Sequence, residues 1–199
     1  MNYIEGLTKE GIRKFTDAIY FSSRNRYDLL DDLLQWSRIN REIFDFNLEV
    51  FKISEVVENV MRILKDNADI KKISLINELQ KDQLIYSDKN VINLVLRNII
   101  SNAIKFTEHG GKIKIDSRPI NGVVEIGMSD TGIGISKELL PEIFTNDVKS
   151  TSGTGNESGT GLGLMLCKEL IEKNGGRIWA ESEIGKGSKF AFTLPTKPN

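Results

Sequence analysis

Three clusters of polar residues and glycines in this sequence combine groups that could bind a phosphorylated ligand. The first lies in the stretch RNIISNAIKFT (97–107), where Asn98, Asn102 and Lys105 recur at spacings of four and three and so share one side of a helix. An amide oxygen is a hard ligand that suits Mg²⁺, and a lysine can offset phosphate charge. The residues alone leave open that both asparagines are solvated or cap neighbouring loops.

The second cluster is SDTGIGI (129–135), directly after a predicted strand. Asp130 ends that strand, and its carboxylate is a good acceptor for the exocyclic amine of an adenine. Gly132 and Gly134 let the backbone approach a flat ring or adopt a positive φ. A turn without a ligand would explain two glycines at this spacing equally well.

The third cluster is GTGLGL, where a polar loop gives way to a helix. Its residues are Gly159, Thr160, Gly161, Leu162, Gly163 and Leu164. The glycines expose backbone N–H groups, and the start of a helix adds partial positive charge, which together favour phosphate. The motif lacks the GKS or GKT of a Walker loop, and its glycines do not follow the first strand of a βαβ unit. A flexible hinge is the alternative.

Composition limits what this chemistry can serve. Hydrophobic residues make up 39% and charged residues 28% of the 199 residues, as in an ordinary globular protein. The formal net charge of −1 argues against nucleic acid as a partner. Cys167 is the only cysteine, which excludes an internal disulfide and a zinc cluster and favours the reducing cytoplasm. No run approaches the roughly 18 apolar residues of a membrane span, and the first residues do not resemble a signal peptide.

The elements that must position these clusters are of mixed α and β type from about residue 50. Ser54, Asp88 and Ser136 are predicted to cap helices, the last of them a short helix that ends near Phe144. Residues 145–160 contain almost no apolar side chains and are predicted to form a mobile loop. The pattern predicts strands at 73–79, 84–86, 112–116, 123–129, 177–183 and 188–194, and helices from 54, at 89–106 and at 162–174.

The chain before this region, from about residue 8 to 44, is predicted to form one long helix. It carries two neighbouring apolar stripes, which comprise Leu29, Leu33 and Trp36, and Tyr27, Leu30 and Leu34. A single helix cannot bury so wide a face by itself. The stripes therefore indicate partner helices in a bundle or, alternatively, packing on the globular part of this chain.

The order of the motifs adds a resemblance to a known family. RNIISNAIKFT, DTGIGI, Ile143 with Phe144, GTGLGL and GKGSKFAFTLP follow one another as in the histidine-kinase branch of the Bergerat ATPase superfamily. The resemblance covers residues 50–196, and residues 25–39 are similar to the second helix of a histidine kinase dimerisation domain. It implies an α+β fold, a two-layer α/β sandwich with a mixed sheet and helices on one face, preceded by a long helix. Residues 1–48 would be a partial dimerisation segment and 49–199 the ATP-binding domain.

The resemblance also implies roles for single residues. Asn102 corresponds to the Mg²⁺ ligand, with Asn98 beside the phosphates of ATP and Lys105 in contact with them. Asp130 corresponds to the acid that reads adenine, helped by Gly134 and by Thr193 on the last strand.

The same family has a lid over the nucleotide. Ile143 and Phe144 resemble the short aromatic box at the start of the ATP lid, residues 145–158 would be the lid, and Gly159–Leu164 would hold the phosphates as it closes. The family box often has a second phenylalanine where Asp147 stands, which implies looser packing of the lid.

The sole histidine, His109, lies in the turn EHGG and outside any motif like that of the family's phosphoacceptor. We therefore expect the γ-phosphate of ATP to go to a histidine on a dimerisation domain upstream of this chain. The implied partners are that domain, a response regulator receiver domain, and a second copy in the full protein.

Two other functions fit part of this pattern. An ATP-hydrolysing conformational switch of the same superfamily would carry a glutamate where Asn98 stands, and an asparagine cannot act as general base. A non-catalytic module that binds a partner through the long helix would not need the intact phosphate-binding motifs.

Overall fold

The computed structural model describes residues 8–9, 11–13, 15–16, 46–80, 82–145, 153–155, 157 and 161–198. The predicted long helix and both of its apolar stripes lie almost entirely outside these residues, which include helical positions at 9, 11–13 and 15–16. None of the helices in the described part of the chain has the length and apolar character needed to cross a membrane.

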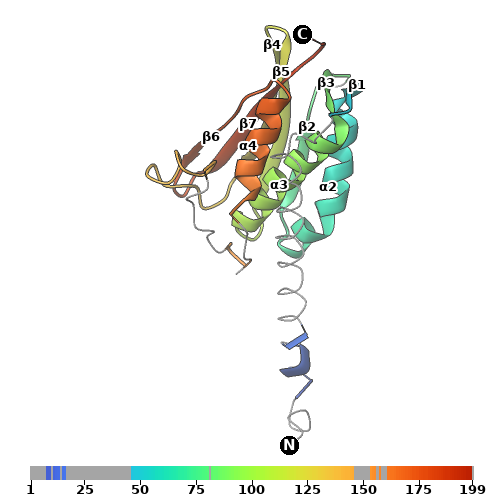
Figure 1. The fold of residues 1–199 in the computed structure, drawn as a ribbon. Helices are drawn as coiled ribbons and strands as arrows, with labels where there is room; N and C mark the ends of the chain where they lie inside the picture. The colour runs from blue at the N-terminus through green and yellow to red at the C-terminus, as the bar shows by residue number, and fades with distance from the viewer. Residues whose placement is uncertain are drawn as a thin grey trace, which may run out of the picture.

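The main body has two layers, a five-stranded sheet and three helices that stand side by side on one of its faces (Figure 1). The strand order is β2-β4-β5-β7-β6, with β2 parallel to β4 and the other pairs antiparallel. The strands are β2 (Ser74–Glu78), β4 (Lys112–Ile120), β5 (Val123–Asp130), β6 (Ile178–Glu183) and β7 (Gly187–Pro195). The helices are α2 (Ile53–Ile70), α3 (Lys89–Phe106) and α4 (Gly163–Lys173). The predicted two-layer sandwich with a mixed sheet is confirmed.

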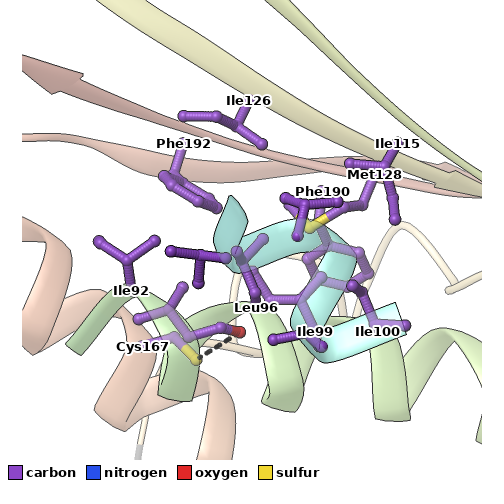
Figure 2. Packing of buried hydrophobic residues seen from close by; sticks show 14 of the residues in the cluster. Ile92, Leu96, Ile99, Ile100, Ile115, Ile126, Met128, Cys167, Phe190 and Phe192 are labelled. Carbon is purple, nitrogen blue, oxygen red and sulfur yellow. Dashed lines mark hydrogen bonds between the residues drawn. The ribbon is translucent and has the colours of Figure 1, made fainter. Parts of the chain in front are cut away.

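The core lies between α3 and the sheet, as Figure 2 shows. One face of α3 and the facing side chains of the strands are fully or almost fully buried; the largest are Ile92, Leu96, Ile99, Ile100, Ile113, Ile115, Ile126, Met128 and Phe192. Burial of a side chain of this size contributes about 1.5–3 kcal/mol, so the packing fixes the rotation of α3 about its axis. The opposite face of the helix is thereby fixed as well.

The start of α3 is held by the predicted cap. The Asp88 carboxylate accepts hydrogen bonds from the N–H groups of Asn90 (2.8 Å) and Val91 (3.2 Å), and its second oxygen accepts one from Asn47 N–H (2.9 Å). The predicted Ser54 cap is wrong: α2 already begins at Ile53, after Lys52, and no side chain caps it. Ile53 N–H instead donates to the Gln83 carbonyl, so a neighbouring segment satisfies that end of the helix.

A second, two-stranded sheet was not predicted. Strand β1 (Leu48–Lys52) pairs antiparallel with β3 (Leu84–Asp88), and Leu48 lies opposite Asp88. A buried polar link joins this sheet to the end of α4, because Ser87 Oγ donates to Asn174 Oδ1 (2.8 Å) and Asn174 Nδ2 donates to the Leu170 carbonyl (2.8 Å).

The short helix predicted after Ser136 is also wrong, because residues 137–144 form a series of turns. Ser136 still organises their start: its hydroxyl accepts from Leu139 N–H (3.3 Å) and its carbonyl from Leu140 N–H (3.0 Å). A single turn of this kind satisfies few backbone groups and needs support from packing, which Ile143 provides at 6% exposure.

The Asp88 cap gives a first testable prediction. Asp88→Ala removes the acceptor for the N–H groups of Asn90 and Val91 in α3 and of Asn47 just before β1. Because these groups lose their partner, the free energy of unfolding should fall by about 1–2 kcal/mol. Asp88→Asn keeps an oxygen for the helix N–H groups and is the matched control, with a smaller loss. Urea unfolding followed by circular dichroism measures both, and an equal loss in the two variants would contradict the cap as the cause.

Candidate functional site

The polar face of α3 is the first part of the site. Asn98, Asn102 and Lys105 are all half-buried on the side of the helix that does not enter the core. The Asn98 amide nitrogen is buried and has no hydrogen-bond partner among the described residues. An unpaired buried amide costs free energy, so this atom is a candidate to donate a hydrogen bond to a ligand.

The start of α4 lies directly against Asn98. A Cβ atom on Gly163 would stand 2.9 Å from Asn98 Oδ1, so a larger residue here would displace the Asn98 amide. The preceding Gly161 has a φ of +79°, and no side-chain cap is present at the start of α4. The partial positive charge of this helix end is therefore available beside Asn98 for an anion. Leu162 and Leu164 are half-buried here, whereas Gly159 and Thr160 lie outside the described residues.

Asp130 forms the second part, at the end of β5. The residue is 8% exposed, and its Oδ1 accepts hydrogen bonds from Gly132 N–H (2.8 Å) and Ser188 N–H (3.2 Å). Burial raises the pKa of this carboxyl, and the two backbone hydrogen bonds offset the rise only in part. Both bonds end on Oδ1, which leaves Oδ2 to accept a hydrogen bond from a ligand.

The glycine turn after Asp130 joins this acid to the end of α3. Ile133 N–H donates to the Phe106 carbonyl (3.1 Å), and a Cβ on Gly132 would stand 2.5 Å from the same oxygen. Gly134 has a φ of +72°, and a Cβ there would stand 2.1 Å from the Glu183 carbonyl. The turn is thus pressed between α3 and the β6–β7 hairpin and needs glycine at both positions.

Two further residues at this position were missed in the sequence. Ser188 donates its N–H to Asp130, and Gly187, with a φ of +92°, approaches so closely that a Cβ would stand 2.0 Å from the Asp130 carbonyl. Ser182 supports them, since its hydroxyl accepts from Ile135 N–H (2.8 Å) and donates to the Gly187 carbonyl (2.9 Å). The sequence signal was GKGS at the start of the last strand.

Thr193, predicted to help Asp130, is not brought to it. Thr193 lies opposite Glu125 in the β5–β7 pairing, and its hydroxyl accepts from Arg177 N–H (3.1 Å). It stands five residues beyond Ser188 along β7, roughly 16 Å at the rise of an extended strand. Ser188 therefore replaces Thr193 as the hydroxyl residue beside the acid.

The predicted aromatic box packs at the edge of the core. Ile143 is buried, and the Phe144 ring meets the Phe190 ring edge-on at 6.4 Å between centroids. These contacts hold the chain where it enters residues 145–158. Of that predicted lid the structure describes 145, 153–155 and 157, and Asp147 lies outside the described residues.

Lys105 and His109 differ in their surroundings. The Lys105 ammonium lies 4.7 Å from the centroid of the Phe106 ring. Burial lowers the pKa of Lys105, the charge of Glu157 raises it and the charge of Lys71 lowers it again. His109 is exposed in the turn between α3 and β4.

Comparison with known proteins finds similarity to histidine kinases along most of this chain. The sequence pattern of the histidine kinase-, DNA gyrase B- and HSP90-like ATPase family matches residues 87–198. The histidine protein kinase DivJ of Caulobacter vibrioides is 32% identical over 183 residues, which are 92% of this chain and 31% of DivJ. The sensor histidine kinase WalK of Bacillus subtilis is 35% identical over 176 residues, which are 85% of this chain and 28% of WalK. This chain thus spans about a third of the length of these two relatives.

Solved structures of histidine kinases also resemble this chain in fold. The catalytic domain of the histidine kinase ThkA, free of nucleotide, has a TM-score of 0.67 at 32% identity and covers 77% of this chain and 97% of its own. Full-length ShkA in complex with AMPPNP has a TM-score of 0.76 at 25% identity, over 97% of this chain and 41% of ShkA.

The buried charge of Asp130 generates the second prediction. A carboxyl whose pKa is raised by folding binds more protons in the folded state, so stability falls as pH rises from its ordinary pKa through the raised value and stays lower above it. Asp130→Asn keeps an oxygen for Gly132 and Ser188 but removes the charge, and should therefore raise the free energy of unfolding at pH 7. Urea unfolding at several pH values should show this gain shrinking at acid pH; a gain that does not depend on pH would count against the buried charge as its source.

Proposed function

Because this chain belongs to the histidine kinase-, DNA gyrase B- and HSP90-like ATPase family, as an ATP-binding catalytic domain of the sensor histidine kinases, we propose that it transfers the γ-phosphate of MgATP to a histidine on a dimerisation domain outside this chain. One observation carries the proposal beyond the family. The Asn98 amide, whose nitrogen has no hydrogen-bond partner within the described ranges, lies beside the glycine start of α4, so a polar group on α3 and a helix N-terminus share one position.

Asp130 is the proposed adenine-reading residue. Its Oδ1 is held by two backbone N–H groups, and Oδ2 accepts from the exocyclic amine, which gives a hydrogen bond of fixed direction in a buried place. Gly132 and Gly134 let the turn lie flat against the base, and Ser188 replaces Thr193 in supporting the acid. A buried, charged acceptor of this kind discriminates strongly against a ring that lacks the amine.

The phosphates are proposed to lie between α3 and the start of α4. Asn98 and the N–H groups at Gly161–Gly163 would meet phosphate oxygens, and Lys105 would offset their charge. Among the described residues no three His, Cys, Asp or Glu side chains gather, so a metal here would bind through amide oxygen and phosphate, as Mg²⁺ does. Asn102 is the proposed ligand, and Mg²⁺, when bound, would neutralise charge on the phosphates.

The acceptor is proposed to lie on another part of the protein. Transfer requires the attacking nitrogen in line behind the phosphorus, at about 3–3.5 Å. His109, the only histidine of the sequence, is exposed in a turn that follows α3. A dimerisation domain that carries the acceptor, a second copy of the protein and a response regulator receiver domain are accordingly the proposed partners, in the cytoplasm.

The residue at position 98 argues against hydrolysis of ATP by this chain. Asn98 occupies the place where the hydrolysing relatives carry their general base, and an amide cannot take a proton from water at neutral pH. The residues on this face of α3 can bind and orient phosphates, which suffices for transfer to a nucleophile supplied from elsewhere.

Nucleotide binding is the third prediction and tests the base-reading residue. Calorimetry should detect MgATP and MgADP binding to the chain, and Asp130→Asn should weaken both by roughly tenfold or more, since a charge-assisted hydrogen bond contributes about 1.5–3 kcal/mol. Asp66→Asn, on the exposed side of α2, is the matched control and should bind like the wild type. Equal affinities of the Asp130 variant and the wild type would remove Asp130 from the site.

Phosphotransfer is the fourth prediction. Incubated with γ-labelled ATP, the chain should remain unlabelled, because no histidine is placed to accept. Addition of a dimerisation domain encoded upstream should give acid-labile label on that domain, and Asn102→Ala should abolish it by removing a Mg²⁺ ligand. Label on His109, or release of inorganic phosphate at the rate of transfer, would contradict the proposed kinase.

A further inference from the structure

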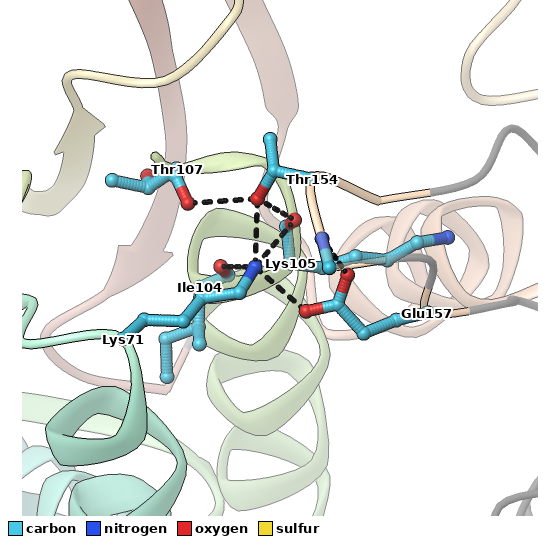
Figure 3. Close-up of polar contacts among 7 residues, drawn as sticks. Lys71, Ile104, Lys105, Thr107, Thr154 and Glu157 are labelled. Atoms are coloured by element: carbon cyan, nitrogen blue, oxygen red, sulfur yellow. Dashed lines mark hydrogen bonds and ion pairs between the residues drawn. The ribbon is translucent and has the colours of Figure 1, made fainter. Parts of the chain in front are cut away.

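A half-buried lysine outside every nucleotide motif links three distant segments of the chain. Lys71, at the C-terminal end of α2, places its ammonium 3.0 Å from each of the Ile104 and Lys105 carbonyls at the end of α3 (Figure 3). The same ammonium donates to Thr154 Oγ1 (2.8 Å) and pairs with Glu157 Oε1 (2.6 Å). Thr154 and Glu157 belong to the predicted ATP lid, more than eighty residues away in sequence.

This ion pair differs from the surface pairs of the molecule. The Lys71 side chain is 14% and the Glu157 side chain 31% exposed, whereas those of the Lys65–Asp69 pair on α2 are 66% and 57% exposed. The ammonium also meets carbonyls at the negative end of the α3 dipole, which adds a favourable field. Burial alone would raise the pKa of Glu157, but the hydrogen bond and charge of Lys71 and backbone N–H groups hold it below its usual value. Such a partly buried, multiply bonded pair is worth more than a solvated one.

The lid residues fit closely onto α3 at this place. Thr154 N–H donates to the Lys105 carbonyl (3.0 Å), and its hydroxyl also lies 3.0 Å from the Thr107 carbonyl. Gly153 packs on Lys105, since a Cβ there would stand 2.4 Å from Lys105 Cγ. Glu157 closes the segment, with its carbonyl accepting from Gly153 N–H (2.9 Å) and its carboxylate from Gly155 N–H (2.8 Å). Gly153 and Thr154 therefore lie against Lys105, the lysine that is proposed to contact phosphate.

The short stretch of chain between Glu157 and Gly161 limits how far apart these two residues can lie. Three residues separate Glu157 from Gly161, so the ends they join can be at most about 14 Å apart. On the far side, α4 is fixed by its buried face, and Gly163 meets Asn98. Glu157 and the start of α4 are therefore both held close to α3, Glu157 through Lys71 and Gly163 by its approach to Asn98.

We propose that Lys71 is a positioning residue for phosphate recognition, which acts through Glu157 and Thr154 to hold residues 153–155 and 157 against Lys105 at the end of α3. The inference rests on the proposed nucleotide site and adds a residue that touches no nucleotide itself. Loss of Lys71 leaves the adenine pocket at Asp130 unchanged but lets the lid segment leave α3. The affinity for phosphate groups falls, and that for the nucleoside stays.

The test compares ligands with and without phosphates. Lys71→Met keeps the apolar stem and removes the ammonium, and Glu157→Gln removes the charge at the other end of the pair with little change in shape. In calorimetry at fixed low salt, each variant should bind MgATP about fivefold or more weakly, the loss that about 1 kcal/mol produces. Adenosine, measured by displacement of a fluorescent nucleotide, should bind each variant within about twofold of the wild type. The double variant should lose much less than the product of the two single losses, because both remove the same contact.

Controls separate positioning from a general loss of structure. Lys65→Met and Asp69→Asn break the exposed pair on the same helix and should change neither affinity. Equal losses for MgATP and adenosine, or a Lys71→Met variant that binds MgATP like the wild type, would overturn the inference. If Lys71→Met fails to fold, Glu157→Gln alone decides between these outcomes. A wild-type chain that binds no MgATP would instead refute the proposed function.

Discussion

The burial of one face of α3 against the sheet is the constraint on which the rest of the site depends. Ile92, Leu96, Ile99 and Ile100 are fully buried, and at about 1.5–3 kcal/mol for each side chain no other rotation of the helix competes. With 3.6 residues per turn, Asn98 and Asn102 then fall on one flank of the helix beside the buried face, where both are half-buried. The packing that gives the fold its stability thus also aims the amides, and no separate device is needed to orient them. The Asp88 cap fixes where this helix begins, and so its register along the sheet.

The other end of α3 works as a junction. The Phe106 carbonyl receives the Ile133 N–H of the glycine turn, and the Lys105 carbonyl receives both Thr154 and Lys71. The last carbonyls of any helix lack partners within the helix, and here segments from three other parts of the chain satisfy them. The glycine turn after Asp130 and the described part of the lid are therefore both held by carbonyl groups at the end of α3, those of Phe106 and Lys105. A shift of α3 would move the base-reading and the phosphate-binding groups together, which keeps their separation matched to one ligand.

Sequence patterns within single segments correctly predicted α3 and most of the strands. The apolar periodicity and the acceptor at Asp88 were sufficient for α3, and alternation with turn residues was sufficient for most strands. Strand β1 was missed because Leu48 and Val50 are exposed and its partner lies far along the chain. Thr193 was predicted to help Asp130, but the pairing register of β7 places Thr193 opposite Glu125 and Ser188 beside the acid. Lys71 gave no signal, since a lysine after a helix is ordinary until a segment more than eighty residues away meets it.

Two features of the proposed site make the fold less stable than it could be, and both lie where the proposed nucleotide would relieve them. Asp130 is charged and buried, and the Asn98 amide is buried without a partner among the described residues. A core of the same shape without polar groups would avoid both penalties. Because only the folded chain brings Asp130 on β5 and Asn98 on α3 together, a ligand that offers an amine to the first and an oxygen to the second would bind the folded state alone, and binding of this kind adds directly to stability. Glu157 meets the same helix, because the Lys71 ammonium that pairs with it also contacts the Ile104 and Lys105 carbonyls. Residues 153–155 and 157 of the predicted lid are therefore held by the last turn of the helix that carries Asn98 and Lys105.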